Sequence, residues 1–438
     1  MRWAWVLLGV TFGIAFFFVP ALAQSDYTFD LAEIEKAVEK KPYSLGGFLE
    51  FKPSLFILDR DAAFYRLKFY DQNEGRVSEQ FDFRLRPEGS LQKGMVSAFA
   101  RIDALLRYDY EGWDSDETLF EGFLSVKPNQ NISLDAGKQV LKWGTGYAWN
   151  PVSFVARPKN PEDPGEDLEG FVMLNANFVK SFKGPLTTFA FTPVLLPVTE
   201  DINNDFGEED HLNVAAKLYL LLWDTDIDLM FFAGGSRANQ YGFDFARNLK
   251  SNLEIHGEWA LITDFEKKTV DREGNLDKER SDVISALLGL RYLTAREMTI
   301  ILEYYHNGRG LTQSEFEDFI AFVDASYETF VTNGDDSSLR RASKLASGTY
   351  TKPNPMRDYL YLRMSQKEPF GLLYSDLALT TIYNLTDSSS VIIPEFSHSP
   401  ITNLELRWRV NFLVGGSDSE YGEKANDYKF ELRARYFF

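Results

Sequence analysis

The chain alternates apolar and polar side chains along most of its length, most regularly at its end. From Tyr428 to Phe438 every even position is apolar or aromatic, and the odd positions are charged until Phe437. Successive side chains of a strand point to opposite faces, so this pattern predicts a strand with one apolar and one ionic face.

Similar period-two segments, separated by turn residues, recur along the chain. They predict strands at residues 45–58, 77–87, 94–109, 117–127, 131–144, 169–180, 186–196, 211–222, 225–234, 240–249, 252–264, 282–293, 296–307, 356–366, 370–385, 389–397, 401–414 and 426–438. Short links such as 128–130 and 183–185 alternate with long ones such as 59–76, 145–168 and 265–281. This alternation, with an even strand count, is typical of membrane barrels. We therefore predict an all-β fold, an antiparallel transmembrane β-barrel of about eighteen strands with sixteen as the alternative count.

One long connection, residues 308–355, carries a helical pattern. Thr312 and Glu315 form a capping box, and an apolar stripe follows until Asn333-Gly334. A second short helix is expected at 338–346. An insert of this length is expected to pack on the barrel rim or fold into the mouth, or else to present its aromatic stripe to a partner.

The first residues have the composition of an export signal. Arg2 precedes a long apolar run, and Ala-Leu-Ala at 21–23 has the form of a cleavage site. We predict a signal peptide over residues 1–23, in preference to a membrane anchor. The segment 24–44 would be periplasmic, with a short amphipathic helix at 28–41 that acts as a leader or as a pore plug. The barrel would then occupy residues 45–438, and membrane insertion would be through strands.

Composition narrows the class of protein further. The 438 residues include no cysteine, which removes disulfides, thiolate catalysis and thiolate metal sites. The formal net charge of −19 argues against nucleic acid as a partner. Aromatic residues make up 15% of the chain, in keeping with the interfacial girdles of membrane barrels.

The final strand resembles that of Gram-negative outer-membrane β-barrels. In that family the aromatic carboxyl-terminal residue, together with an aromatic two positions earlier, belongs to the signal read by the assembly machinery. Phe438 and Tyr436 match these positions. The resemblance implies the cell outer membrane as location, and membrane lipid and the barrel-assembly machinery as partners.

The segment 137–151 reads Gly-Lys-Gln-Val-Leu-Lys-Trp-Gly-Thr-Gly-Tyr-Ala-Trp-Asn-Pro. It resembles the G-x-Q-x-x-x-W-G then N-P pattern of alginate-export-type, eighteen-stranded porins. Its glycines permit bends where a loop folds inward. We expect the loop 145–168 to form a constriction, and its candidate residues are Trp143, Tyr147, Trp149 and Asn150. The aromatic rings would anchor and scaffold the loop, or stack on sugar-like solutes.

The polar faces of the predicted strands would line the pore. Closure of the barrel brings the last strands beside the first, which predicts a basic wall made of Lys52, Arg84, Arg86, Arg101, Arg107, Arg407, Arg409, Arg433 and Arg435. Strands near the middle of the chain would supply an acidic wall made of Asp226, Asp228, Asp244, Glu254 and Glu258. Walls of opposite sign would select among solutes. The alternative is a structural ladder, in which these charges neutralise one another.

The sequence offers no signature of an enzyme, a cofactor or a metal site. The four histidines are scattered over different hairpins, and none has a partner at metal-ligand spacing. We therefore expect a porin-like channel for small anionic or sugar-like solutes. A non-conducting scaffold, plugged by the helical insert and sheathing a partner or serving export, is the main alternative. A homo-oligomer, or a periplasmic or surface partner, is compatible with either.

Overall fold

The computed structural model describes residues 41–72 and 74–438. The predicted signal peptide and the predicted N-terminal helix lie outside this range. In the described part of the chain, no helix is long and apolar enough to cross a membrane.

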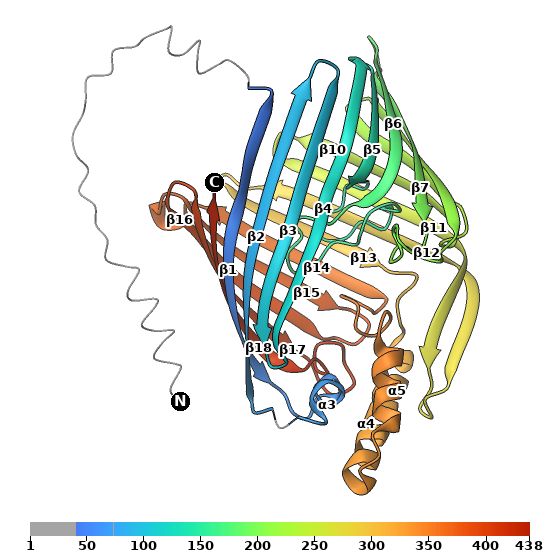
Figure 1. Ribbon diagram of the computed structural model, residues 1–438, viewed down its shortest axis with the longest axis vertical. Helices are drawn as coiled ribbons and strands as arrows, with labels where there is room; N and C mark the ends of the chain where they lie inside the picture. Colours follow the sequence, from blue (N-terminus) through green and yellow to red (C-terminus); the bar gives the residue numbers. More distant parts are fainter. Residues whose placement is uncertain (1–40, 73) are drawn as a thin grey trace, which may run out of the picture. The chain divides into compact units, whose positions relative to one another are not determined.

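Eighteen antiparallel strands form a single sheet that closes on itself, because β1 pairs with both β2 and β18 (Figure 1). The strands are β1 (Tyr43–Leu58), β2 (Val77–Lys93), β3 (Val96–Asp109), β4 (Gly112–Asn129), β5 (Ile132–Gln139), β6 (Phe171–Ser181), β7 (Leu186–Val198), β8 (His211–Leu222), β9 (Thr225–Ala233), β10 (Gln240–Lys250), β11 (Leu253–Val270), β12 (Leu276–Leu293), β13 (Met298–His306), β14 (Asp358–Lys367), β15 (Ser375–Asn384), β16 (Ser390–Ile401), β17 (Leu404–Val414) and β18 (Asn426–Phe437). The predicted fold class and the count of eighteen are confirmed. Closure leaves no unpaired sheet edge.

Helices occupy the long connections on one side of the barrel. They are α3 (Ala63–Phe69), α4 (Gln313–Asn333) and α5 (Ser337–Ala346). A 3-10 turn, η1 (Pro369–Gly371), lies in the short connection between β14 and β15, at the other end of the strands. The capping box of α4 is present as predicted, and Gly334 ends that helix in the left-handed conformation. The link at 59–76, for which no element was predicted, contains α3. The prediction of a loop at 265–281 was wrong, since β11 and β12 continue through most of this range.

The two faces of the sheet differ in the way the period-two pattern predicts. Along β17, Trp408 and Phe412 are exposed on the outer face, whereas Arg407 and Arg409 are buried on the inner face. Exposed leucine, phenylalanine and tyrosine side chains continue this outer apolar surface on the other strands. Soluble proteins rarely expose a continuous apolar surface of this extent to water.

The inner face is not uniformly polar, so the expectation that the polar faces of the strands line the pore does not hold for every strand. Buried apolar side chains line the inside of β6 to β9, among them Phe171, Leu196 and Phe232. They form one hydrophobic cluster with Phe154 and Trp143, which belong to the segment between β5 and β6. The side chains of these strands are apolar on both faces, because a loop rather than water covers the inner face.

The helical insert packs on the barrel's own loops. Phe316 and Phe319 of α4 are buried against Tyr350 and against Phe64 of α3. On another side, Lys267 of β11 forms a 2.6 Å ion pair with Glu315 at the start of α4. Because α3 joins β1 to β2, far around the ring from β11, α4 bridges two distant parts of the rim. The aromatic stripe is therefore largely covered by the protein itself.

Candidate pore constriction

The loop 140–170 leaves the barrel wall early and runs inward. β5 has only 8 residues, whereas its neighbour β4 has 18, so the chain departs from the wall well before the rim. This loop, which we call the constriction loop, contacts strands on several sides of the barrel interior (Figure 1). It covers the segment that the sequence singled out at 145–168.

Two buried glutamates hold the first half of the constriction loop. Glu258 of β11 accepts hydrogen bonds from the Gly146 amide at 2.6 Å and the Asn150 side chain at 2.8 Å. Glu303 of β13 accepts from the backbone amides of Tyr147 and Ala148 at 2.5 and 2.9 Å. Charge-assisted bonds of this kind are stronger than bonds between neutral groups. The two carboxylates therefore fix the loop backbone against the wall.

Two glycines allow this close approach. Gly144 has a φ of +94°, and a Cβ atom there would lie 2.6 Å from a Glu258 carboxylate oxygen. A Cβ atom on Gly146 would lie 2.1 Å from the Trp149 carbonyl oxygen. Any side chain at either position would displace the loop.

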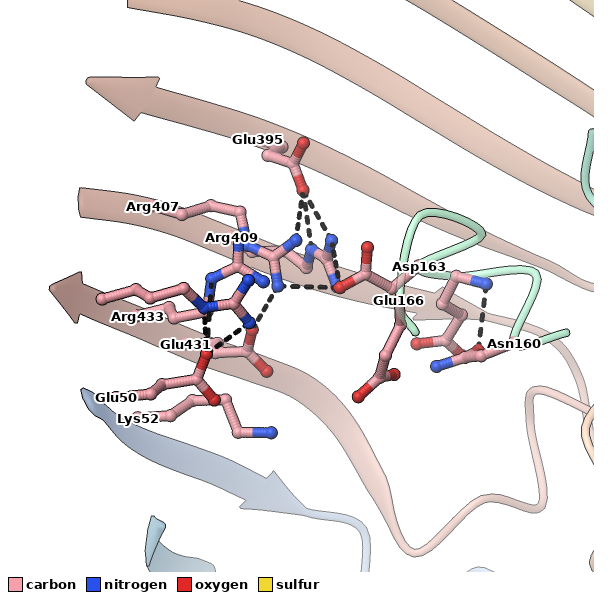
Figure 2. Close-up of polar contacts among 12 residues, drawn as sticks. Glu50, Lys52, Asn160, Asp163, Glu166, Glu395, Arg407, Arg409, Glu431 and Arg433 are labelled. Atoms are coloured by element: carbon pink, nitrogen blue, oxygen red, sulfur yellow. Dashed lines mark hydrogen bonds and ion pairs between the residues drawn. The ribbon is translucent and has the colours of Figure 1, made fainter. Parts of the chain in front are cut away.

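The second half of the constriction loop carries carboxylates to the opposite wall. Asp163 lies 2.8 Å from Arg407 and 3.3 Å from Arg409, both on β17 (Figure 2). Burial alone would raise the pKa of Asp163, but Arg409 and Arg407 hold that pKa well below its usual value. Farther along the loop, Glu166 and Asp167 approach Arg84 and Arg86 at 3.8 and 3.3 Å. The loop thus spans the interior between two differently charged regions.

The predicted basic wall is one continuous patch on β17, β18, β1, β2 and β3. Register places Arg407 opposite Arg433, and Arg435 opposite both Glu405 and Glu50. Each cation of the predicted wall has a carboxylate within 4 Å; the pairs include Lys52–Asp82, Arg84–Asp103, Arg86–Asp103, Arg101–Glu121, Arg107–Asp82, Arg409–Glu395, Arg433–Glu405 and Arg435–Glu50. Figure 2 shows this network around Glu431 and Glu395. Interleaved carboxylates therefore neutralise much of the positive charge.

The predicted acidic residues also lie on inner faces, but they do not form a free acidic wall. Asp226 accepts a hydrogen bond from the Tyr219 hydroxyl, and Asp228 pairs with Lys217 at 3.2 Å. Glu254 lies 3.6 Å from His256. Asp244 stands between Asp228 and Glu258 in register, and neither of its buried oxygens has a hydrogen-bond partner among the described residues.

The candidate aromatic residues lie inside packed clusters. Trp143 and Trp149 are 3% and 7% exposed. Trp149 stacks on Tyr305, with ring centroids 5.1 Å apart, and its indole N–H donates to Asn354 of the insert at 3.3 Å. Tyr147 is half-buried beside Tyr361. These positions suit a loop scaffold and leave the two tryptophans little surface on which a solute could stack.

Glu420 and Tyr421 join the last long loop, residues 415–425, to β14, β15 and the insert. Glu420 accepts hydrogen bonds from the Tyr359 hydroxyl at 2.7 Å and the Asn384 side chain at 2.9 Å. Asn354 of the insert donates to the Tyr421 hydroxyl at 2.9 Å. Burial raises the pKa of Glu420 to about 7, against the opposing effects of Lys424 and the Tyr359 hydroxyl.

We expect the stability of this junction to depend on pH through Glu420. A glutamate carboxyl ordinarily has a pKa of 4.5, whereas burial raises the pKa of Glu420 in the folded protein to about 7. The contribution of Glu420 to the stability of the junction is therefore full below pH 4.5 and is lost as pH rises through 7. The difference between the two pKa values corresponds to about 3 kcal/mol of stability. Protease protection of residues 415–425, followed from pH 4.5 to 8, should fall with rising pH. Glu420→Gln should flatten this dependence, whereas the exposed Asp418→Asn in the same loop should leave it unchanged; an unaltered slope in Glu420→Gln would contradict the assignment.

Sequence reasoning missed several residues that hold the constriction loop or pair with the arginines that hold it. Glu303, Glu395 and Asp163 were not singled out, although each is buried or half-buried and charged. Glu303 alternates with apolar residues on β13, which identifies its inner-face position. Nothing in the local pattern indicates that it meets the amides of Tyr147 and Ala148, more than 150 positions away in sequence.

The structure brings together few groups suited to catalysis. Across the described ranges, no cluster of three or more His, Cys, Asp or Glu side chains is arranged to hold a metal ion. His398 does meet a serine, with its Nδ1 atom 2.8 Å from the Ser375 hydroxyl. Ser375 is only 2% exposed, so this hydroxyl offers little access to a substrate.

Comparison with known proteins gives similarity at the level of fold alone. No family model and no curated protein matches the sequence. Among solved structures, a porin variant from Rhodopseudomonas blastica aligns with 90% of this chain and 100% of its own, at 10% identity and a TM-score of 0.43. Pseudomonas aeruginosa OprD covers 90% of this chain and 95% of its own, at 12% identity and a TM-score of 0.48. An OccD1 (OprD) variant covers 91% and 97%, at 13% identity and 0.49. None of these names the alginate-export type, so that resemblance remains an expectation from sequence.

Proposed function

We propose that this protein is an outer-membrane channel for small polar solutes, with its aperture set by the constriction loop. The outer face of the closed barrel exposes apolar side chains, and a closed barrel satisfies its backbone polar groups in lipid. A membrane is the environment that matches this surface. Such a channel requires membrane lipid and a small solute as partners. We also propose that the assembly machinery recognises Tyr436 and Phe438.

The observation that carries the proposal is the fixation of one loop at both ends inside the barrel. Glu258 and Glu303 hold its beginning, and Arg407 and Arg409 hold Asp163 near its end. A loop that is fixed in this way narrows the lumen to a defined size and charge. Fixed apertures of this kind give channels their selectivity.

The charge distribution favours uncharged or weakly charged solutes over strong anion selection. The predicted basic wall is interleaved with carboxylates, and Glu166 and Asp167 of the loop add exposed negative charge in front of it. A passing anion would therefore meet guanidinium groups that already have partners. Of the two solute classes expected from sequence, the sugar-like class agrees better with this arrangement.

We expect the double substitution Arg407→Ala and Arg409→Ala to make the channel prefer cations. Asp163 and Glu395 would lose their closest cationic partners, so negative charge would dominate that wall. The ratio of potassium to chloride permeability should rise by about tenfold, as charged clefts concentrate counter-ions to this extent. Reversal potentials in planar bilayers measure this ratio. Arg296→Ala, in an exposed turn between β12 and β13, is the matched control, and an unchanged ratio in the double variant would argue against a conducting path along this wall.

A second candidate function is a non-conducting scaffold, which the position of the helical insert favours. α4 bridges loops from distant parts of the rim, and its hydrophobic cluster continues inward to Trp149 and Tyr361. A rim bridged in this way would suit a barrel that sheathes a partner. Wild-type protein that forms no conducting steps in planar bilayers would support the scaffold and overturn the channel.

A further inference from the structure

The inner faces of β2 to β5 form a pocket near the short turns of the barrel. Its volume is about 390 Å³, which lies within the range of about 300–1,000 Å³ usual for small-molecule sites. The pocket lies on the same strands as Arg101 and Glu121, and nearer than they are to the turns that join β2 to β3 and β4 to β5. A solute that passed the constriction loop along these strands would reach it next.

Strand register builds the pocket from a row of hydroxyl groups beside an aromatic pair. Ser97 of β3 stands opposite Ser125 of β4, and Ser125 stands opposite Asp135 of β5. Two positions along the same strands, Phe99 stands opposite Phe123, with ring centroids 5.7 Å apart. The pocket thus combines hydrogen-bonding groups with an apolar surface made by two aromatic rings tilted at 45° to one another.

Two of its polar side chains are buried and lack an internal partner. Ser125 is 4% exposed and Gln139 is 5% exposed. Neither the Ser125 hydroxyl nor the Gln139 amide nitrogen has a hydrogen-bond partner among the described residues. Buried polar groups are almost always satisfied, so these two groups mark positions where an ordered water or a bound ligand would complete the hydrogen bonding.

The charge of the pocket selects the class of ligand. Lys127 and Asp135 are its two ionisable residues, and their charges are opposite. Its remaining polar groups are hydroxyls and the Gln139 amide, which exchange hydrogen bonds with other hydroxyls. An aromatic face beside them suits the apolar face of a sugar ring.

We propose that this pocket is a binding subsite for an uncharged, polyhydroxylated solute of the size of a monosaccharide. Ser125 and Gln139 bond its hydroxyls, while Phe99 and Phe123 pack against its ring. The proposal rests on the channel function proposed above and names the solute class that the channel would carry. The subsite would hold the solute between the constriction loop and the periplasmic opening.

Titration of the full-length protein in detergent with D-glucose, followed by saturation-transfer NMR, tests the subsite. Wild-type protein should bind glucose saturably, and glycine at the same concentrations should give no saturable signal. The double substitution Ser125→Ala and Gln139→Met should weaken glucose binding by about tenfold or more, because two hydrogen bonds are lost. Phe99→Leu, which keeps an apolar side chain but removes the ring, should also weaken it. Ser181→Ala, at the exposed end of β6, is the matched control.

The outcomes separate the subsite from the channel. Absence of saturable glucose binding to wild-type protein, or equal binding by wild type and both folded variants, would overturn the subsite. Planar-bilayer recordings on the same preparation report on the channel alone. Conductance without glucose binding would reject only the subsite, and glucose binding that depends on Ser125 and Gln139 without conductance would reject only the channel. Heat-modifiable migration in gels shows whether each variant is a folded barrel, and Phe99→Leu carries the test if the double variant does not fold.

Discussion

Replacing Glu258 and Glu303 together by alanine is expected to raise the single-channel conductance severalfold. The two carboxylates accept hydrogen bonds from the backbone amides of Gly146, Tyr147 and Ala148. Each buried amide left without an acceptor costs about 1–3 kcal/mol. The position of the constriction loop against β11 and β13 should therefore lose most of its free-energy advantage over positions away from these strands. The lumen should then widen.

Single-channel recording in planar bilayers measures this effect directly. Glu266→Ala is the matched control, because Glu266 lies on the same strand as Glu258 and its charged partners among the described residues are Lys268, Lys278 and Arg280 of the β11–β12 hairpin. Conductance equal to that of wild type in the double variant would mean that the loop does not set the aperture. The single variants should show smaller increases, since each carboxylate holds neighbouring amides of the same short segment.

The substitution Phe319→Ala is expected to detach the helical insert while the barrel stays intact. Phe319 is fully buried, stacks on Tyr350 with ring centroids 3.9 Å apart, and contacts Phe64 of α3. Removal of a buried phenylalanine side chain costs about 3–5 kcal/mol. The contacts between α4 and the rim comprise this cluster and a few ion pairs, so such a loss should expose α5 to proteases.

Limited trypsin digestion measures this detachment. Cleavage at Arg340, Arg341 or Lys344 of α5 should become faster in Phe319→Ala, whereas Val331→Ala should leave it unchanged because Val331 is 62% exposed on the same helix as Phe319. Equal cleavage rates in both variants would show that the aromatic cluster does not hold the insert. Conductance of Phe319→Ala then distinguishes two roles: a rise indicates that the insert restricts the mouth, and no change indicates that it is only a rim element.

The local pattern of the sequence determined the strands, because the period of side-chain direction is a property of the backbone alone. Residues 426–438 predict β18 and the outward position of its aromatic side chains without reference to any other segment. The helix α4 could also be predicted from the local sequence, since its capping box and its end at Gly334 depend on local hydrogen bonds. The short helix α3 has no side-chain cap, and its contacts with α4 and α5 stabilise it instead, so local reasoning did not find it.

Only the tertiary structure decided what the inward-facing residues do. The sequence placed Arg407 and Glu258 on polar faces, but their partners Asp163 and Gly146 come from segments far away in the chain. The partner of Arg409, Glu395, comes from the adjacent strand β16. The inside of β6 to β9 is apolar because the constriction loop covers it, which no period along those strands reveals. Periodicity therefore assigned each side chain to a face of the sheet. Whether a charge on that face is free or paired depended on barrel closure and on the path of one loop, because ion pairs form between neighbours in space.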